Sequence, residues 1–337
     1  MSIASTNSTD LTDEFGARWN RFWFTPAEAL PCCLMRIVVG LLAATFFINL
    51  TFQLSDWYAR DGVLPPAAVN ELLKLTNAGD VNYHPSYLSF FSGGIELRVL
   101  HFAAIVVAVA FAIGFFTRVS GVLTLVLLLA YVHRVPQVAG HLEPVLCFLI
   151  PYLCIAPSGT MLSLDRRLFG TAKKSSLAGL LMGPSEPSVS ANIGLRLIQV
   201  HVAMFYAMLG LTKLYGDAWW DGNAIWLLLA QTQSRPVDLT GLRRLGSVGE
   251  YLLNFWTHAI VYFELAFPVL IWTRLFRPIV LAASVFVWLS VILATGQLLF
   301  GLAMLATGIA FLPAAYLRVF AGQATPAFAA PQGAVAA

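Results

Sequence analysis

Lys213 is the residue of this sequence best suited to chemistry. It ends the apolar run 197–213 and is followed at once by Gly216-Asp-Ala-Trp219-Trp220-Asp-Gly222. A lysine at the edge of hydrocarbon is costly unless it reaches water, pairs with an acid or loses its proton. A neutral amine can serve as a general base, which suits proton abstraction from a lipid-soluble molecule. The simpler interpretation is an end-of-helix lysine whose ammonium reaches the interface beside the tryptophans.

Two more polar features belong to apolar runs. Gln199, Tyr206 and Lys213 recur every seven residues, so they form one stripe on a helical face. That stripe must face protein or a cavity, because a lipid-facing surface would not be polar. Glu264 lies inside the apolar run 257–273 and must be protonated, paired or turned toward a cavity.

His141 opens another apolar run, in Gly140-His141-Leu-Glu143-Pro144. A histidine at such a position is either a hydrogen-bonded structural residue or part of a reactive site, and His133 and Arg134 could tune it. Histidine, lysine and acid together show neither the spacing of metal ligands nor that of a Ser-His-Asp triad. We therefore expect no metal.

The composition indicates which elements position these residues. Of 337 residues, 58% are hydrophobic and only 11% are charged, and the mean hydropathy is +0.76. A soluble domain carries roughly 25% charged residues, so the sequence predicts a polytopic membrane protein. The net charge of +3 is small and spread out, which gives no support for nucleic-acid binding.

The predicted fold is all-α, a transmembrane helix bundle of about eight spans. A span needs roughly 20 apolar residues, and eight segments qualify. They are 33–54, 98–116, 119–135, 142–157, 193–213, 257–273, 277–295 and 297–317. Only Thr295-Gly296-Gln297 separates the last two, which would form a tight hairpin or, if merged, reduce the count to seven.

Three regions follow from this pattern. Residues 1–32 are expected to form an amphipathic segment on the membrane surface, 33–320 the transmembrane domain, and 321–337 a disordered tail. Residues 55–97 and 214–256 form two longer loops. Arg36 and Arg196 begin spans, where arginines commonly anchor lipid headgroups.

Basic residues in the short linkers set the orientation. They gather in 158–192 and in the turn with Arg274 and Arg277, which predicts that these linkers and both termini are cytoplasmic. Lys213, His141 and both long loops are then external. The expected location is the plasma (inner) membrane, with membrane lipids as the surrounding partners.

Several short motifs, in this order, resemble the HTTM (horizontally transferred transmembrane) domain family over about residues 18–320. They are Trp19-Asn-Arg-Phe-Trp23, Arg36 with Gly40, Trp57-Tyr58 with Asp61-Gly62, Pro157-Ser-Gly with Leu162-Ser-Leu-Asp165, Lys213-Leu-Tyr-Gly-Asp-Ala-Trp219, and Phe263-Glu-Leu265 with Pro268. The family includes the vitamin K-dependent γ-glutamyl carboxylase.

The resemblance implies a role for each candidate. In that carboxylase a lysine deprotonates vitamin K hydroquinone for reaction with oxygen, and Lys213 matches its position. His141, upstream of Ser163-Leu-Asp165, matches a histidine that stabilises the reacting centre. Tyr206, Trp219 and Glu264 are the expected contacts of the cofactor, either vitamin K hydroquinone or menaquinol.

Departures from the family pattern keep three functions open. The carboxylase carries a large extramembrane portion that this sequence lacks, and Thr212 stands where it has a second lysine. The first function is a carboxylase-like or epoxidase-like enzyme that uses a reduced quinone. The second is a non-enzymatic maturation factor for a secreted peptide, as in the sporulation-delaying toxin system. A transporter is least favoured, because no internal repeat is visible.

Overall fold

The computed structural model describes residues 8–76, 86–170, 186–231 and 236–320, and within them it is built from helices with no strand longer than one isolated bridge. The predicted tail 321–337 lies outside the described residues. The helices are α1 Ser8–Phe24, α2 Leu30–Leu50, α3 Leu54–Tyr58, α4 Pro66–Thr76, α5 Gly94–Ile113, α6 Thr117–Arg134, α7 Leu142–Ile155, α8 Leu164–Phe169, α10 Val189–Lys213, α11 Asp217–Trp220, α12 Ala224–Ala230, α13 Ser247–Leu270, α14 Arg277–Thr295, α15 Leu298–Thr307 and α16 Ala314–Phe320.

The all-α prediction is confirmed, and each of the eight predicted apolar segments contains a helix. Within the described residues, five helical segments are long and apolar enough to cross a membrane. They are Leu30–Tyr58, Gly94–Ile113, Val189–Lys213, Ser247–Leu270 and Arg277–Thr295. Helix α7 and the segment Leu298–Phe311 are apolar but shorter. These lengths agree with a multi-pass membrane protein.

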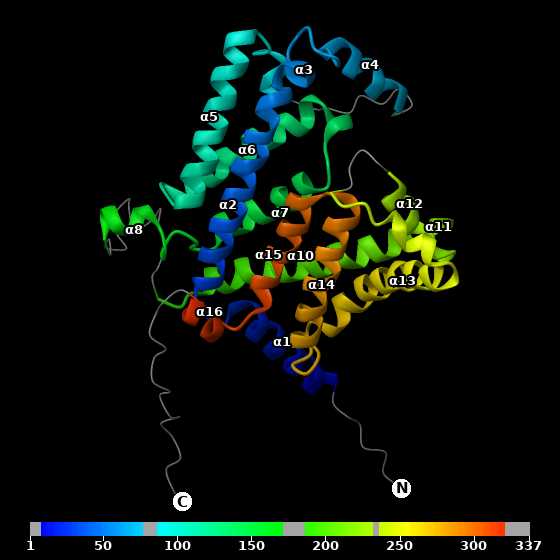
Figure 1. Cartoon of the computed structure of the whole chain (residues 1–337). Coiled ribbons are helices and arrows are strands. Elements are labelled where there is room, and N and C mark those ends of the chain that lie inside the picture. The colour runs from blue at the N-terminus through cyan, green and yellow to red at the C-terminus, as the bar shows by residue number, and fades with distance from the viewer. Residues whose placement is uncertain (1–7, 77–85, 171–185, 232–235, 321–337) are drawn as a thin grey trace, which may run out of the picture.

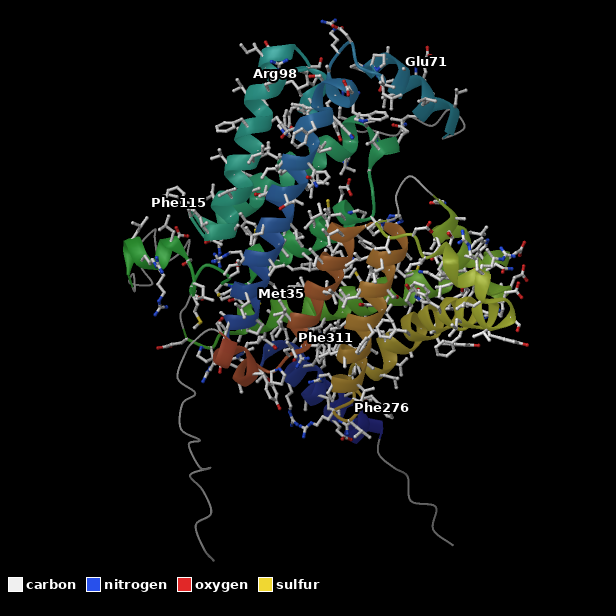
Figure 2. All side chains as sticks on the ribbon, in the orientation of Figure 1. Met35, Glu71, Arg98, Phe115, Phe276 and Phe311 are labelled. Carbon is white, nitrogen blue, oxygen red and sulfur yellow. The ribbon has the colours of Figure 1, made fainter. Side chains whose placement is uncertain are left out.

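Successive apolar helices pack against one another, and the last closes the bundle. Helix α2 packs on α5, α5 on α6, α6 on α7, α7 on α10, and α10 on α13, while α15 returns to contact both α2 and α7. Figure 1 shows α10 crossing the bundle behind α15, and α13 packs against α10. Met35 of α2 and Phe311, which follows α15, lie in the core (Figure 2). This closure places the C-terminal half of α10 between α13 and the core.

The predicted hairpin between the last two apolar segments is confirmed. Helix α14 ends at Thr295, Gly296 adopts a left-handed conformation with φ of 71°, and α15 begins at Leu298 and packs back on α14. Glycine reaches this conformation without the steric penalty of a side chain, so a turn this short is available.

The N-terminal segment forms the helix α1, which is fastened to α10. The Asn192 amide donates to the carbonyl oxygens of Phe22 and Trp23, both at 2.8 Å. The Arg196 guanidinium lies 4.3 Å from the centre of the Phe22 ring and donates to Gln199 at 2.8 Å. Arg196 therefore has contacts within the protein, and its role as a headgroup anchor stays a prediction.

The structure contradicts the prediction that Arg36 anchors a lipid headgroup. Its side chain is fully buried, and it donates to the carbonyl oxygens of Ser158 and Leu162 at 2.8 and 2.6 Å. A loop that leaves its carbonyls inside the protein needs donors there. The guanidinium supplies them, so it cannot reach a headgroup.

Gly40 allows α2 and α5 to touch, which leads to a first prediction. A Cβ at this position would lie 2.5 Å from Ala112 Cα, a backbone atom that cannot rotate away. Gly40→Ala is expected to lower the free energy of unfolding by about 2 kcal/mol, although alanine favours helices by about 1 kcal/mol. Gly16→Ala on α1 is the matched control, because no atom of the described residues lies within 4 Å of its added Cβ. Equal stability of the two variants in thermal unfolding would contradict the close crossing.

Candidate functional site

The end of α10 holds a bidentate ion pair between Lys213 and Glu264. Lys213 Nζ lies 2.7 Å from Glu264 Oε2 and 2.9 Å from Oε1, and it also donates to the Leu209 carbonyl at 3.3 Å. The Lys213 side chain is 17% exposed and that of Glu264 only 3%. Of the three states expected for Glu264, the structure therefore has the paired one.

A glycine brings the two helices close enough for this pair. Gly210 lies one turn before Lys213 on α10, and its added Cβ would meet Leu265 of α13 at 2.8 Å. Leu265 follows Glu264 directly, so the closest approach of the helices lies beside the pair. A side chain at Gly210 would push Lys213 away from its acid.

Trp219 covers the pair from the next helix. The chain turns after α10 into the short α11, and Lys213 Nζ lies 5.1 Å from the centre of the Trp219 ring. Gly222 then reverses the chain with φ of 72°, and its carbonyl accepts a hydrogen bond from Thr257 of α13 at 3.0 Å. The ammonium is thus held between a carboxylate and an aromatic face, both of which favour a cation.

Tyr206 lies two turns below Lys213, inside a cluster of aromatic rings. Its ring stacks on Phe267 with centroids 3.8 Å apart and meets Phe263 edge-on at 5.7 Å. Its hydroxyl accepts a hydrogen bond from Trp288 Nε1 at 2.6 Å. The predicted stripe on α10 is confirmed as protein-facing, because Gln199 and Tyr206 are both buried.

His141 lies at the other end of the same aromatic row. Its ring is 5.4 Å from Phe300, and Phe300 meets Trp288 edge-on at 5.1 Å. The imidazole is exposed at the start of α7, and among the described residues it has no hydrogen-bond partner. The structure therefore brings Lys213, Glu264 and Trp219 into contact, whereas His141 is linked through Phe300 and Trp288 to Tyr206, two turns before Lys213 on α10.

Sequence reasoning missed a second polar group, between α2, α5 and α6. His101 accepts or donates at both ring nitrogens, to Thr51 Oγ1 at 2.9 Å and to the Tyr131 hydroxyl at 2.8 Å. Tyr131 packs on Tyr58 with ring centroids 4.9 Å apart. An intramembrane histidine is unusual enough to have flagged this group.

Arg134, the last residue of α6, belongs to the same region and lies near Tyr58. It is buried, and its three guanidinium nitrogens have no hydrogen-bond partner among the described residues. Tyr87, within the predicted loop 55–97, also has a buried hydroxyl without a hydrogen-bond partner among the described residues. Burial raises the pKa of Tyr87 to about 12. That phenol is therefore neutral at physiological pH.

The Lys213–Glu264 pair can carry one proton in two ways, as an ion pair or as a neutral amine beside a neutral acid. In a site of low dielectric both arrangements have no net charge, so the pair can hand a proton over without creating an isolated buried ion. The structure places this lysine–carboxylate ion pair beside the stacked rings of Tyr206 and Phe267.

Comparison of the chain with protein-family models, curated proteins and solved structures finds no match.

Proposed function

We propose that the protein is a membrane enzyme that removes a proton from the hydroxyl of a reduced quinone, with Lys213 as the base. The buried ion pair with Glu264 carries the proposal. For Lys213 to accept a proton it must first be neutral, and Glu264 at 2.7 Å is the group that can hold the displaced proton. Glu264 is then a proton store, and Lys213 is the group that touches the substrate.

The residues around the pair fit a flat, apolar ring with a polar edge. Trp219 is a partly buried aromatic ring beside Lys213, Phe263 precedes Glu264 on α13, and the buried Tyr206 ring packs edge-on against Phe263. Aromatic walls with a few convergent polar groups are typical of sites for such molecules. When bound, vitamin K hydroquinone or menaquinol would supply an acidic hydroxyl and the electrons for reaction with oxygen.

His141 has a more distant role in this proposal. Its exposed imidazole at the start of α7 is joined to Tyr206 by Phe300 and Trp288. Since its imidazole makes no hydrogen bond to the described residues, His141 can bind an anion that forms near the start of α7. The order of the motifs, which resembles that of the HTTM family, supports the same assignment of Lys213 and His141.

The decisive experiment compares two replacements of Lys213 in the purified full-length protein. With vitamin K hydroquinone or menaquinol supplied in nanodiscs, Lys213→Ala is expected to lower hydroquinone-dependent oxygen consumption at least about a hundredfold. Lys213→Arg is expected to lose as much turnover while it keeps the ion pair, because a guanidinium stays protonated. Lys74→Ala on α4 is the control, since Lys74 is an exposed lysine far along the chain from the pair.

The alternative function gives a different result in the same assay. A maturation factor for a secreted peptide would show no hydroquinone-dependent oxygen consumption, and Lys213→Arg would leave peptide maturation intact. Wild-type turnover equal to that of Lys213→Arg would remove the base assignment and leave Lys213–Glu264 as a structural pair.

We further propose that the protein lies in the plasma (inner) membrane with both termini in the cytoplasm. Support comes from Arg166 and Arg167 at α8 and from Arg274 and Arg277 in the short turn between α13 and α14. A reporter enzyme that is active only on the external side of the membrane should be silent when fused to the N-terminus. It should be active when inserted at Gly241, in the loop 214–256. The reverse pattern would overturn the orientation.

A further inference from the structure

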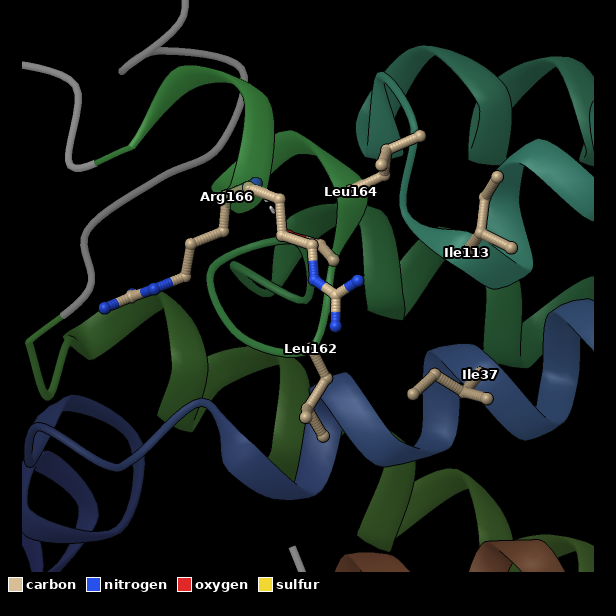
Figure 3. Close-up of a pocket in the computed structure, with 7 residues that line it drawn as sticks. Ile37, Ile113, Leu162, Leu164 and Arg166 are labelled. Atoms are coloured by element: carbon tan, nitrogen blue, oxygen red, sulfur yellow. Dashed lines mark hydrogen bonds between the residues drawn. The ribbon is translucent and has the colours of Figure 1, made fainter.

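A cavity of about 690 Å³ opens where the ends of α2 and α5 meet α8, far from Lys213 in the fold. Figure 3 shows Ile37 on α2, Ile113 at the end of α5, and Leu162, Leu164 and Arg166 around a common space. The full lining is Ile37, Ile113, Leu162, Ser163, Leu164, Arg166 and Arg167. Apolar side chains from two membrane-spanning helices thus share one cavity with two arginines.

Two buried charged residues fix the walls of this cavity. Arg36 holds the loop after α7 by donating to the carbonyls of Ser158 and Leu162. Asp165 accepts hydrogen bonds from Phe116 N at 2.7 Å, Thr117 N at 3.0 Å and Thr117 Oγ1 at 2.9 Å. These bonds tie α2, the α5–α6 turn and α8 into one junction, so the cavity has a fixed shape.

Backbone strain is concentrated at the same junction. Among the described residues, the non-glycine residues with positive φ are Phe116 at 44° and Leu162 at 52°. Bulky residues rarely adopt this conformation, and such strain persists where the surrounding contacts impose it, often at ligand sites. Leu162 lines the cavity with a side chain that is 41% exposed, so the strained conformation shapes its wall.

The two arginines of α8 are available to a ligand. Arg166 uses Nη1 to donate to the Thr160 carbonyl at 2.8 Å, and its other guanidinium nitrogens have no partner among the described residues. Arg167 is exposed and likewise has no hydrogen-bond or ion-pair partner in the part of the chain that the structure describes. The nearest acid in sequence, Asp165, is buried and already accepts three hydrogen bonds. Two arginines that form no ion pair with a described acid therefore make one edge of the cavity positive.

We propose that this cavity binds one anionic phospholipid of the surrounding membrane, with its phosphate on Arg166 and Arg167. Guanidinium forks match phosphate oxygens in geometry and charge. Ile37 and Ile113 belong to helices that cross the bilayer, so acyl chains of the same lipid can run along them. Only a molecule with both an anionic head and apolar chains satisfies both halves of the lining.

The test counts lipids bound to the purified full-length protein by native mass spectrometry, with short-chain phosphatidylglycerol or phosphatidylcholine added. The wild type is expected to retain phosphatidylglycerol in preference to phosphatidylcholine. Arg166→Gln/Arg167→Gln is expected to weaken phosphatidylglycerol binding by about tenfold or more, with phosphatidylcholine binding unchanged.

The matched control is Arg60→Gln/Arg98→Gln, which removes the same charge from two exposed arginines elsewhere. Figure 2 shows Arg98 at the far end of α5 from the cavity. This control should stay within about twofold of the wild type. An equal loss in both double variants, no loss in either, or full displacement of the lipid by equimolar inorganic phosphate would overturn the proposal. None of these outcomes depends on Lys213, so the test is separate from that of the quinone enzyme.

Discussion

Lys213→Met is expected to lower the free energy of unfolding by about 3–5 kcal/mol. It removes the cation that lies 2.7 and 2.9 Å from the two oxygens of Glu264, whose side chain is only 3% exposed. The carboxylate would then stand alone in an apolar interior or take up a proton, and either change is costly. Titration with sodium dodecyl sulfate in mixed micelles measures the loss.

The opposite change should cost less, because the two partners differ in exposure. In Glu264→Gln the Lys213 ammonium is left without its acid, but its side chain is 17% exposed and can extend toward the interface. The double variant Lys213→Met/Glu264→Leu should recover most of the stability, since an apolar pair replaces a buried ion pair at little cost. Strictly additive losses in the double variant would show that the two residues are not coupled.

Helix positions followed from the sequence, whereas helix partners did not. Runs of apolar residues located every long helix, and the spacing of Gln199, Tyr206 and Lys213 predicted a protein-facing stripe that the structure confirms. An acid inside an apolar run predicted that Glu264 is protonated, paired or turned toward a cavity. Nothing in the sequence chose Lys213, because that choice depends on the crossing of α10 and α13 at Gly210.

The function of arginines at helix ends was the least predictable feature. Arg36 and Arg196 occupy positions typical of headgroup anchors, yet one supports loop carbonyls and the other stacks on Phe22. Position along a helix predicts how far a guanidinium is from the interface. It does not predict which buried carbonyl or aromatic ring the guanidinium will contact. These partners belong to residues more than a hundred positions away in sequence, such as Ser158 for Arg36.

The sequence also could not predict whether His141 and Lys213 contact each other. Predicted topology placed both at the same side of the membrane. The structure separates them by the row of Phe300, Trp288 and Tyr206, which are aromatic residues of three helices. Their order along the row depends on how α14 and α15 pack, and no local pattern encodes it.

Gly114→Ala is expected to have the second largest effect on stability, a loss of about 3 kcal/mol. Gly114 ends α5 with φ of 73°, and an added Cβ would lie 2.6 Å from both Arg36 Nη1 and Ser163 Cβ. Alanine therefore meets two penalties, the left-handed backbone and a clash with a guanidinium that is already bonded to two carbonyls. Displacing Arg36 would leave the carbonyls of Ser158 and Leu162 unpaired inside the protein.

Gly170→Ala separates the two penalties. Gly170 follows α8 with φ of 63° and ψ of −147°, a conformation almost confined to glycine, so alanine there meets a backbone penalty of about 1–3 kcal/mol. No atom of the described residues lies within 4 Å of its added Cβ, so no clash adds to that penalty. If Arg36 fixes the wall of the cavity at α8, Gly114→Ala should lose its preference for phosphatidylglycerol, while Gly170→Ala keeps it. Retention of that preference in Gly114→Ala would mean that the junction yields to the methyl group and that Arg36 does not hold it in place.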